Sequence, residues 1–132
     1  MLWCFVLAAH LFFMSHNQEV GKFGEMLAKN YLIRHGYEII DLNVKLSYQE
    51  LDIVARKRGL AIFVEVKTRI SQVYGSAEEA FAFSKSRRFQ KGIEMYIRNH
   101  KICADDIRGD LITVDIDRLK KTAKIKHYKD II

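Results

Sequence analysis

Apolar residues recur along much of the chain with the period of a helix or of a strand. Spacings of three and four residues predict a helix over residues 17–34. Its buried face would be formed by Val20, Phe23, Leu27 and Tyr31. Gly36 follows, and a glycine in the left-handed conformation commonly ends a helix. Three apolar segments then predict strands over residues 37–44, 51–55 and 60–66.

The second half of the chain predicts one more helix and two more strands. Ser76 and Glu79 have the spacing of a capping box, so we expect a long helix from Ser76 to about Asn99. Residues 111–116 predict a strand, and weaker alternation over residues 122–128 predicts a strand at the edge of the sheet. The order α-β-β-β-α-β, followed by the edge strand, indicates an α/β fold with a central mixed sheet flanked by two helices.

The first 14 residues differ from the rest because they are mostly apolar and include no Asp, Glu, Lys or Arg. They are too few for a membrane span, which needs ~20 apolar residues, and they lack the basic start of a signal peptide. The alternatives are a degenerate signal or anchor, an apolar flap packed on the domain, and a stretch upstream of a natural start at Met14. We favour the last, and expect a leader over residues 1–14 outside the core and a single domain over residues 15–132.

Composition narrows the class of protein. Lys and Arg number 22 and Asp and Glu number 16, which gives a net charge of +6 and favours a polyanionic partner such as nucleic acid. The two cysteines are too few for a disulfide framework and suit a reducing cytoplasm, where we expect the protein. No histidine or cysteine spacing resembles a zinc site. We expect no membrane partner.

The turn between the second and third strands decides which side chains share a face. A two-residue turn at Gly59 is favoured, because glycine can take a positive φ. In the resulting register Asp52 lies opposite Glu65, on the face that also carries Glu50 and Lys67. A three-residue loop would instead put the first two carboxylates on opposite faces.

An ionised carboxylate inside an apolar strand needs a partner. For Glu65 the simplest partner is Lys67, two residues along the same face. Asp52 weakens this interpretation, since two carboxylates about 5 Å apart repel by about 3 kcal/mol at an effective dielectric constant of about 20. A divalent cation is the alternative, because Mg²⁺ is held by one or two carboxylates with water and phosphate oxygens. On the residues alone, a metal site and a salt-bridge cluster stay equally open.

These residues resemble the PD-(D/E)xK nuclease signature, on the αβββαβ order of the restriction-endonuclease-like core. The signature segments are Asp52 and Phe63-Val64-Glu65-Val66-Lys67-Thr68-Arg69. More closely, the chain resembles the YraN-like family of small bacterial proteins related to Holliday junction resolvases. The match extends over about residues 17–117 and also includes Gly24-Glu25, Gly36-Tyr37, Glu50-Leu51-Asp52-Ile53-Val54 and Tyr74-Gly75-Ser76-Ala77. The apolar leader departs from the family pattern.

The resemblance implies a nuclease that depends on Mg²⁺ or Mn²⁺. Asp52 and Glu65 would be the metal ligands, and the backbone carbonyl of Val66 is a further candidate ligand. Lys67 would be the catalytic lysine, which stabilises charge on the attacked phosphate.

Glu25 and Glu50 are assigned less directly. Glu25 lies on the flank of the first helix beside Gly21 and Ala28, whose small side chains would let the helix approach the sheet. In resolvase-like nucleases a first-helix glutamate often joins the metal site, and the resemblance carries this catalytic role onto Glu25. The alternative is an ion pair with Lys29. Glu50 either binds the metal through water or forms an ion pair across the strands.

Candidate contacts to nucleic acid are basic. Lys85 interrupts the apolar stripe of the long helix and either extends to solvent or meets a phosphate. A run of basic residues without an acid among them follows late in the chain: Arg118, Lys120, Lys121, Lys124, Lys126 and Lys129. Such lysines either protect an edge strand or contact phosphates without reading bases. The candidate nucleic-acid-binding residues are Arg69, Lys85, Lys120, Lys121, Lys124 and Lys126.

Together these observations predict a Mg²⁺-dependent nuclease that hydrolyses phosphodiester bonds in DNA, with branched or damaged DNA as the expected substrates. One alternative is a DNA-binding or adaptor domain without catalysis, because a fold does not settle a function. Another is an interaction protein whose acidic cluster is an ion-pair network. Symmetric cutting of a junction would require a homodimer.

Overall fold

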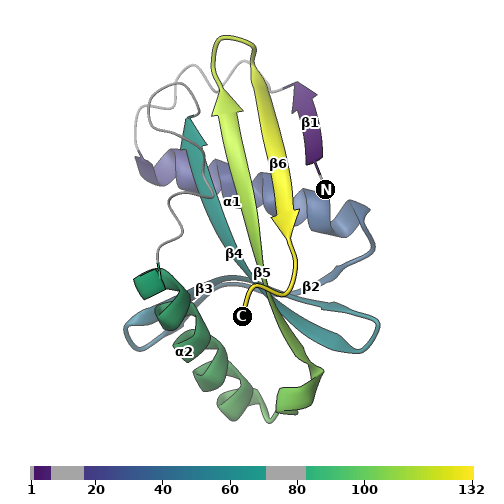
Figure 1. Ribbon diagram of the computed structural model, residues 1–132, viewed down its shortest axis with the longest axis vertical. Helices are drawn as coiled ribbons and strands as arrows, with labels where there is room; N and C mark the ends of the chain where they lie inside the picture. Colours follow the sequence, from purple (N-terminus) through teal and green to yellow (C-terminus); the bar gives the residue numbers. More distant parts are fainter. Residues whose placement is uncertain (1, 7–16, 71–82) are drawn as a thin grey trace.

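The computed structural model describes residues 2–6, 17–70 and 83–132 (Figure 1). Within these residues the strands are β1 (Leu2–Val6), β2 (Glu38–Leu46), β3 (Gln49–Lys57), β4 (Leu60–Ile70), β5 (Ile107–Asp117) and β6 (Thr122–Tyr128). The helices are α1 (Asn17–Arg34), α2 (Phe83–His100) and a short 3-10 helix, Ala104–Asp106. None of the described helices is long and apolar enough to cross a membrane.

All six described strands form one mixed sheet in the order β1-β6-β5-β4-β3-β2. β4 and β5 are parallel, and every other neighbouring pair is antiparallel. A parallel pair needs a long crossover connection, which explains why α2 lies between β4 and β5 in the chain. This arrangement confirms the predicted α/β fold, with the αβββαβ order from α1 to β5, a mixed sheet and two helices.

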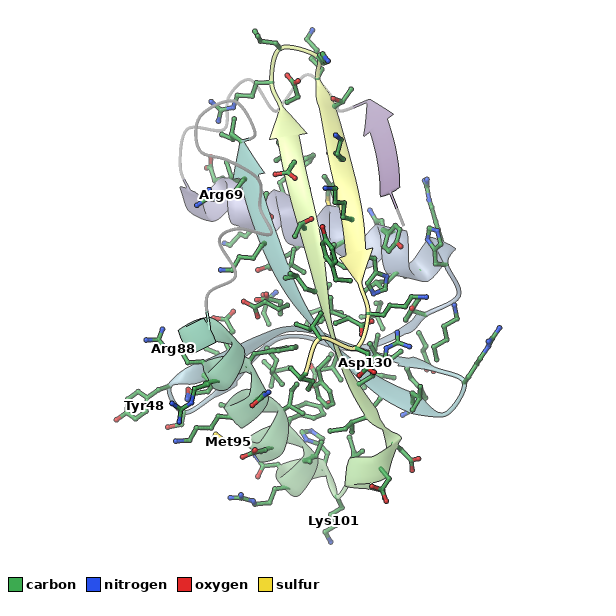
Figure 2. All side chains as sticks on the ribbon, in the orientation of Figure 1. Tyr48, Arg69, Arg88, Met95, Lys101 and Asp130 are labelled. Carbon is green, nitrogen blue, oxygen red and sulfur yellow. The ribbon has the colours of Figure 1, made fainter. Side chains whose placement is uncertain are left out.

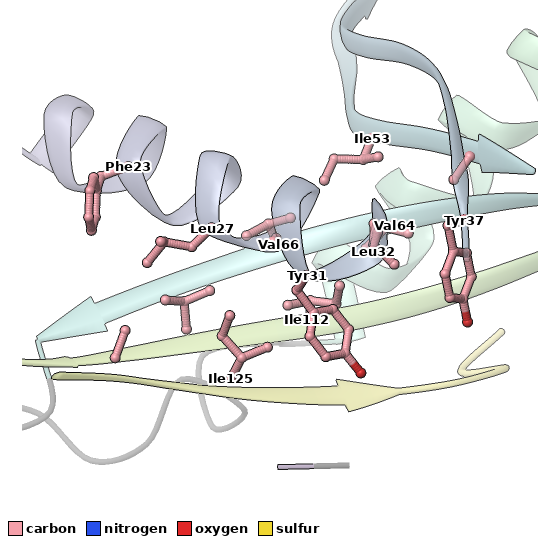
Figure 3. Packing of buried hydrophobic residues seen from close by; sticks show 14 of the residues in the cluster. Phe23, Leu27, Tyr31, Leu32, Tyr37, Ile53, Val64, Val66, Ile112 and Ile125 are labelled. Carbon is pink, nitrogen blue, oxygen red and sulfur yellow. The ribbon is translucent and has the colours of Figure 1, made fainter. Parts of the chain in front are cut away.

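The two helices pack on opposite faces of the sheet, because successive side chains of a strand point to opposite sides. α1 covers the face shown in Figure 3, in a cluster that includes Phe23, Leu27, Tyr31, Val64, Val66, Ile112 and Ile125. α2 packs against β3 and β2 on the other face, in a cluster that includes Leu51, Val54, Phe63, Phe89, Ile93 and Tyr96. The described part of α2 leaves β6 and much of β5 uncovered on that face (Figure 1).

Two glycine positions behave as predicted and set the chain direction around the sheet. Gly36 has a φ of +84°, and the Tyr37 amide donates to the Leu32 carbonyl at 3.0 Å, as in a Schellman motif. At the β3–β4 hairpin, Arg58 and Gly59 have φ values of +51° and +81°. These values are typical of a type I′ turn, and they confirm the two-residue hairpin.

The apolar leader differs from the expectation. Residues 2–6 form β1, which pairs antiparallel with β6 from Leu2 opposite Lys126 to Val6 opposite Thr122. We expected the leader to lie outside the core and β6 to be the edge strand. A free edge on β6 would expose unpaired backbone N–H and C=O groups, and pairing with an apolar segment satisfies them. Residues 7–14 lie outside the described part of the chain.

Several of the predicted strands were too short. β4 continues to Ile70 and β5 begins at Ile107, because their polar terminal residues still pair in the sheet. The extension of β4 matters for function, since it places Lys67 and Arg69 on a strand. The predicted start of the long helix, at Ser76, lies outside the described residues.

Candidate metal and nucleic-acid site

The candidate site begins where β3 and β4 separate. Backbone pairing between these strands extends as far as Ile53 opposite Val64. Beyond that point β4 continues beside β5, and β3 continues beside β2. The amide of Val66 donates to Oδ2 of Asp52 at 2.8 Å. A side-chain carboxylate therefore takes the place of a backbone acceptor at the point of separation.

Asp52 and Glu65 meet at this point, as the predicted turn requires. A hydrogen bond joins their side chains, and both residues are half-buried. Burial raises the pKa of Asp52, and the charge of Glu50 adds to this effect. The hydrogen bonds from Val66 and Glu65 and the charge of Lys67 oppose the increase without cancelling it. A hydrogen bond between two carboxyl groups requires a proton on one of them. The raised pKa of Asp52 comes from burial and not from this bond.

Lys67 completes the predicted signature. It follows Glu65 by two residues on β4 and is half-buried. Its positive charge acts on Asp52. The structure therefore brings Asp52, Glu65 and Lys67 together on one face of the sheet.

Glu25 approaches the same cluster from α1. Burial raises the pKa of Glu25 to about 7, with further contributions from the negative charges of Asp52 and Glu50. The cation that lowers this pKa is Lys22 rather than Lys29, the partner in the alternative interpretation. The electrostatic environment of Glu25 is thus set mainly by burial and by the carboxylates of β3.

Gly24 allows α1 to approach β4 closely. A Cβ on Gly24 would overlap with the side chain of Thr68, so glycine is required there. We expected Gly21 and Ala28 to allow this approach. Ala28 is indeed fully buried, but a Cβ on Gly21 would have no atom within 4 Å among the described neighbours. Because Glu25 follows Gly24 in the chain, this contact also fixes the Glu25 backbone close to β4.

An open cleft of about 730 Å³ leads to the acidic cluster between α1 and the β2–β3 hairpin. Its lining combines both signs of charge and includes Lys22, Glu25, Lys29, Lys45 and Glu50. Glu25 and Glu50 are thus accessible to solvent and to small ions from this side.

The described residues contain no group of three Asp, Glu, His or Cys side chains arranged to hold a metal ion by themselves. The adjoining carboxylates of Asp52 and Glu65 nevertheless fit the donor set of Mg²⁺, which commonly uses one or two carboxylates together with water and phosphate oxygens. The predicted roles of Glu50 and of the Val66 carbonyl stay predictions.

Beyond the acidic cluster, the same face of the sheet continues as rows of polar residues. The first row contains Lys67 and the residues paired with it across the strands, Thr113 and Lys126. The next row is Arg69, Asp115 and Lys124, and Figure 2 shows Arg69 near the far end of β4. Thr113 is fully buried, and its Oγ1 has no hydrogen-bond partner among the described residues. Sequence reasoning missed Thr113, although its alternation with Ile112 and Val114 placed it on this face.

The remaining predicted nucleic-acid contacts differ in exposure. Lys120 and Lys121 are exposed in the turn between β5 and β6, and Lys124 is exposed on β6. Lys126 is half-buried. Lys85 belongs to α2, but its side chain lies outside the described part of the structure.

A buried polar network on the α1 face was also missed. Asp110 is fully buried, and Arg108 donates to it through Nε and Nη2, each at 2.8 Å. Nε2 of His127 lies 2.8 Å from the same carboxylate, and the Asp130 amide donates to it at 3.0 Å. The Tyr31 hydroxyl lies 3.3 Å from Nδ1 of His127. These contacts link α1 to β5 and β6.

Comparison with known proteins places the chain in a family. Residues 24–114 match the sequence model of the uncharacterised protein family UPF0102, a range that spans the acidic cluster. A UPF0102 protein of Clostridium beijerinckii is 39% identical over 114 residues, which cover 86% of this chain and 93% of that protein. One from Dictyoglomus turgidum is 37% identical over 99 residues, covering 75% and 84%.

Among solved structures, the chain is similar to the fdxN element excision controlling factor protein of Anabaena variabilis. The TM-score is 0.38 and the identity 19%, over 79% of this chain and 92% of that one. The family matches, rather than this distant likeness, confirm the resemblance to YraN-like proteins. The chain belongs to the uncharacterised protein family UPF0102.

Proposed function

We propose that this protein is a Mg²⁺-dependent nuclease that hydrolyses phosphodiester bonds in DNA. The observation that carries the proposal is the hydrogen-bonded pair of Asp52 and Glu65, with the charge of Lys67 acting on it, where β3 and β4 separate. Two adjoining carboxylates are costly unless they share a proton or a cation. A purely structural site would more simply pair each carboxylate with a cation of its own.

Each residue has a role that follows from its position. Asp52 and Glu65 would hold Mg²⁺, which when bound polarises a phosphate and lowers the pKa of a coordinated water. Lys67 stabilises the negative charge that develops on the attacked phosphate. Glu25 approaches from α1, and its ionised form adds negative charge to the field that attracts the cation.

The basic residues of the sheet face support DNA as the substrate. The rows that continue from Lys67 include Lys124 and Lys126, and the adjoining turn adds Lys120 and Lys121. Such side chains contact phosphates and position a strand without reading its sequence. The expected substrates are therefore distinguished by shape, as branched or damaged DNA is. Symmetric cutting of both strands of a junction would require a homodimer.

A DNA-binding or adaptor domain without catalysis is the second candidate. It is favoured by one observation, namely that the described residues provide no three-ligand metal centre. Both candidates predict DNA binding, so cleavage and metal affinity distinguish them.

The test is cleavage of labelled duplex, flap and four-way-junction DNA in Mg²⁺, with EDTA as the control. We expect cleavage by the wild type in Mg²⁺ and its loss in Lys67→Ala, which keeps both proposed metal ligands. Binding without cleavage of any of these substrates would contradict the nuclease and favour the adaptor.

A further inference from the structure

Tyr48 forms the tip of the β2–β3 hairpin and is 99% exposed, the largest exposed fraction among the large hydrophobic side chains that the structure describes. The turn is tight, since Leu46 pairs with Gln49 and Ser47 has a φ of +59°. Such turns favour Gly, Asn and Asp. An aromatic ring that buries almost no surface adds little to the free energy of folding. Its presence at this tip therefore needs another explanation.

α2 supplies basic side chains beside this turn. An open cleft of about 420 Å³ is lined by Gln49, Arg87, Arg88, Gln90, Lys91 and Glu94. Arg87, Arg88 and Lys91 are exposed, and Figure 2 shows Tyr48 and Arg88 on the same side of the molecule. The cleft thus presents three cations and one acid, Glu94, to the solvent.

This combination fits single-stranded nucleic acid. Proteins bind such strands with basic side chains that follow the phosphates and aromatic rings on which bases stack. In a duplex the base faces are already stacked on one another, so an exposed ring gains little from an intact helix. An acidic protein surface would satisfy the three cations but would not account for the ring at the tip.

The hairpin tip is also close to the acidic cluster. Tyr48 precedes Asp52 by four residues, and β3 begins at Gln49. At ~3.3 Å per residue the two positions are roughly 13 Å apart along the strand. That separation corresponds to about four stacked base steps of ~3.4 Å. One short strand of nucleic acid can therefore reach both.

We propose that Tyr48, Arg87, Arg88 and Lys91 form a contact site for unpaired nucleotides. Tyr48 stacks on an unpaired base, and the basic side chains of α2 hold the neighbouring phosphates. The inference rests on the proposed nuclease function and narrows its substrate class to DNA with an unpaired segment next to the cleavage site.

The test measures binding in EDTA, so that it does not depend on catalysis. Fluorescence anisotropy compares a short single-stranded oligonucleotide with a strand of the same length that carries abasic positions. Tyr48→Ala should weaken binding of the ordinary strand by about 5-fold to 100-fold, as expected for one lost stacking contact. It should leave binding of the abasic strand nearly unchanged. Tyr48→Phe should bind both strands as the wild type does, because it keeps the ring.

Two further variants serve as a control for exposed hydrophobic side chains and as a test of the basic side chains. Ile33→Ala removes another exposed hydrophobic side chain, 51% exposed on α1, and should leave binding unchanged. The double variant Arg87→Gln, Lys91→Gln should weaken the ordinary and the abasic strand alike and reduce the salt dependence. Equal binding by Tyr48→Ala and the wild type would overturn this inference while leaving the nuclease proposal standing. A wild type that binds no DNA of any form would overturn both.

Discussion

A hydrogen bond joins the side chains of Asp52 and Glu65 at the position where β3 and β4 separate. The separation lets the Asp52 carboxylate accept from the Val66 amide, which would otherwise pair with a backbone carbonyl. A backbone amide at the end of the β3–β4 pairing therefore helps to hold the acidic pair, in addition to the contact between the two side chains. Such a rigid arrangement suits a site that must keep two carboxyl groups together.

The salt dependence of DNA binding tests the basic face of the sheet. Changing Lys120, Lys121, Lys124 and Lys126 to Gln should weaken binding of all sequences alike and flatten the plot of log affinity against log salt. Each lost phosphate contact should reduce the slope by about 0.9. Lys101→Gln is the matched control, because Lys101 is exposed beyond the end of α2, away from this face (Figure 2). An unchanged slope in the quadruple variant would move the main binding surface elsewhere.

The packing of α1 can be tested with two glycines of the same helix. Gly24→Ala should destabilise the protein by about 1–3 kcal/mol, because its methyl group would overlap with Thr68. Gly21→Ala should be neutral or stabilising by up to about 1 kcal/mol, because its position is open and alanine favours a helix. Urea denaturation measures both. Equal stability of the two variants would show that the approach of α1 to β4 is not limited by Gly24.

Lowering the pH should reduce the stability of the folded protein through Asp110. Burial alone would raise the pKa of Asp110, but the hydrogen bonds from His127 and Arg108 outweigh it and hold the pKa below its ordinary value. The unfolded chain therefore binds a proton more readily than the native state, and stability falls as the pH drops below about 4. At neutral pH the contribution is fully present.

Asp110→Asn isolates this contribution. The variant should lose about 3–5 kcal/mol at neutral pH, because Arg108 would keep a largely buried charge without its partner. Its melting temperature should then fall less steeply than that of the wild type between pH 5 and pH 3, in a series of thermal melts. A parallel decline in both proteins would show that other carboxylates dominate acid unfolding.

Local chemistry explains which features the sequence predicted. Gly36 and Gly59 have positive φ values, and each ends or reverses an element without help from distant residues. Because the turn at Gly59 is local and strand side chains alternate, the meeting of Asp52 with Glu65 could be predicted from the sequence. The helix over residues 17–34 has the predicted bounds for the same reason, since its apolar spacing is regular.

The features that sequence reasoning missed depend on contacts between distant elements. The overlap of Gly24 with Thr68 appears only when α1 is placed on β4. Asp110 and His127 are 17 residues apart and meet because β5 and β6 are neighbours in the sheet. The pairing of β1 depends on the free edge of β6, which an isolated apolar segment does not reveal. Tyr48 has no periodic signal, and only its exposure distinguishes it.

In the proposed nuclease, Asp52 and Glu65 hold a divalent cation. Calorimetric titration of the wild type and Glu65→Gln with Mn²⁺, each paired with a melting curve, tests this claim most directly. We expect the wild type to bind Mn²⁺ and Glu65→Gln to lose most of this affinity while it stays at least as stable, because the Gln amide can donate to Asp52 without a proton shared between two carboxyl groups. Absence of Mn²⁺ binding by the wild type, with a loss of about 3–5 kcal/mol of stability in Glu65→Gln, would contradict the account and show a structural ion-pair cluster instead.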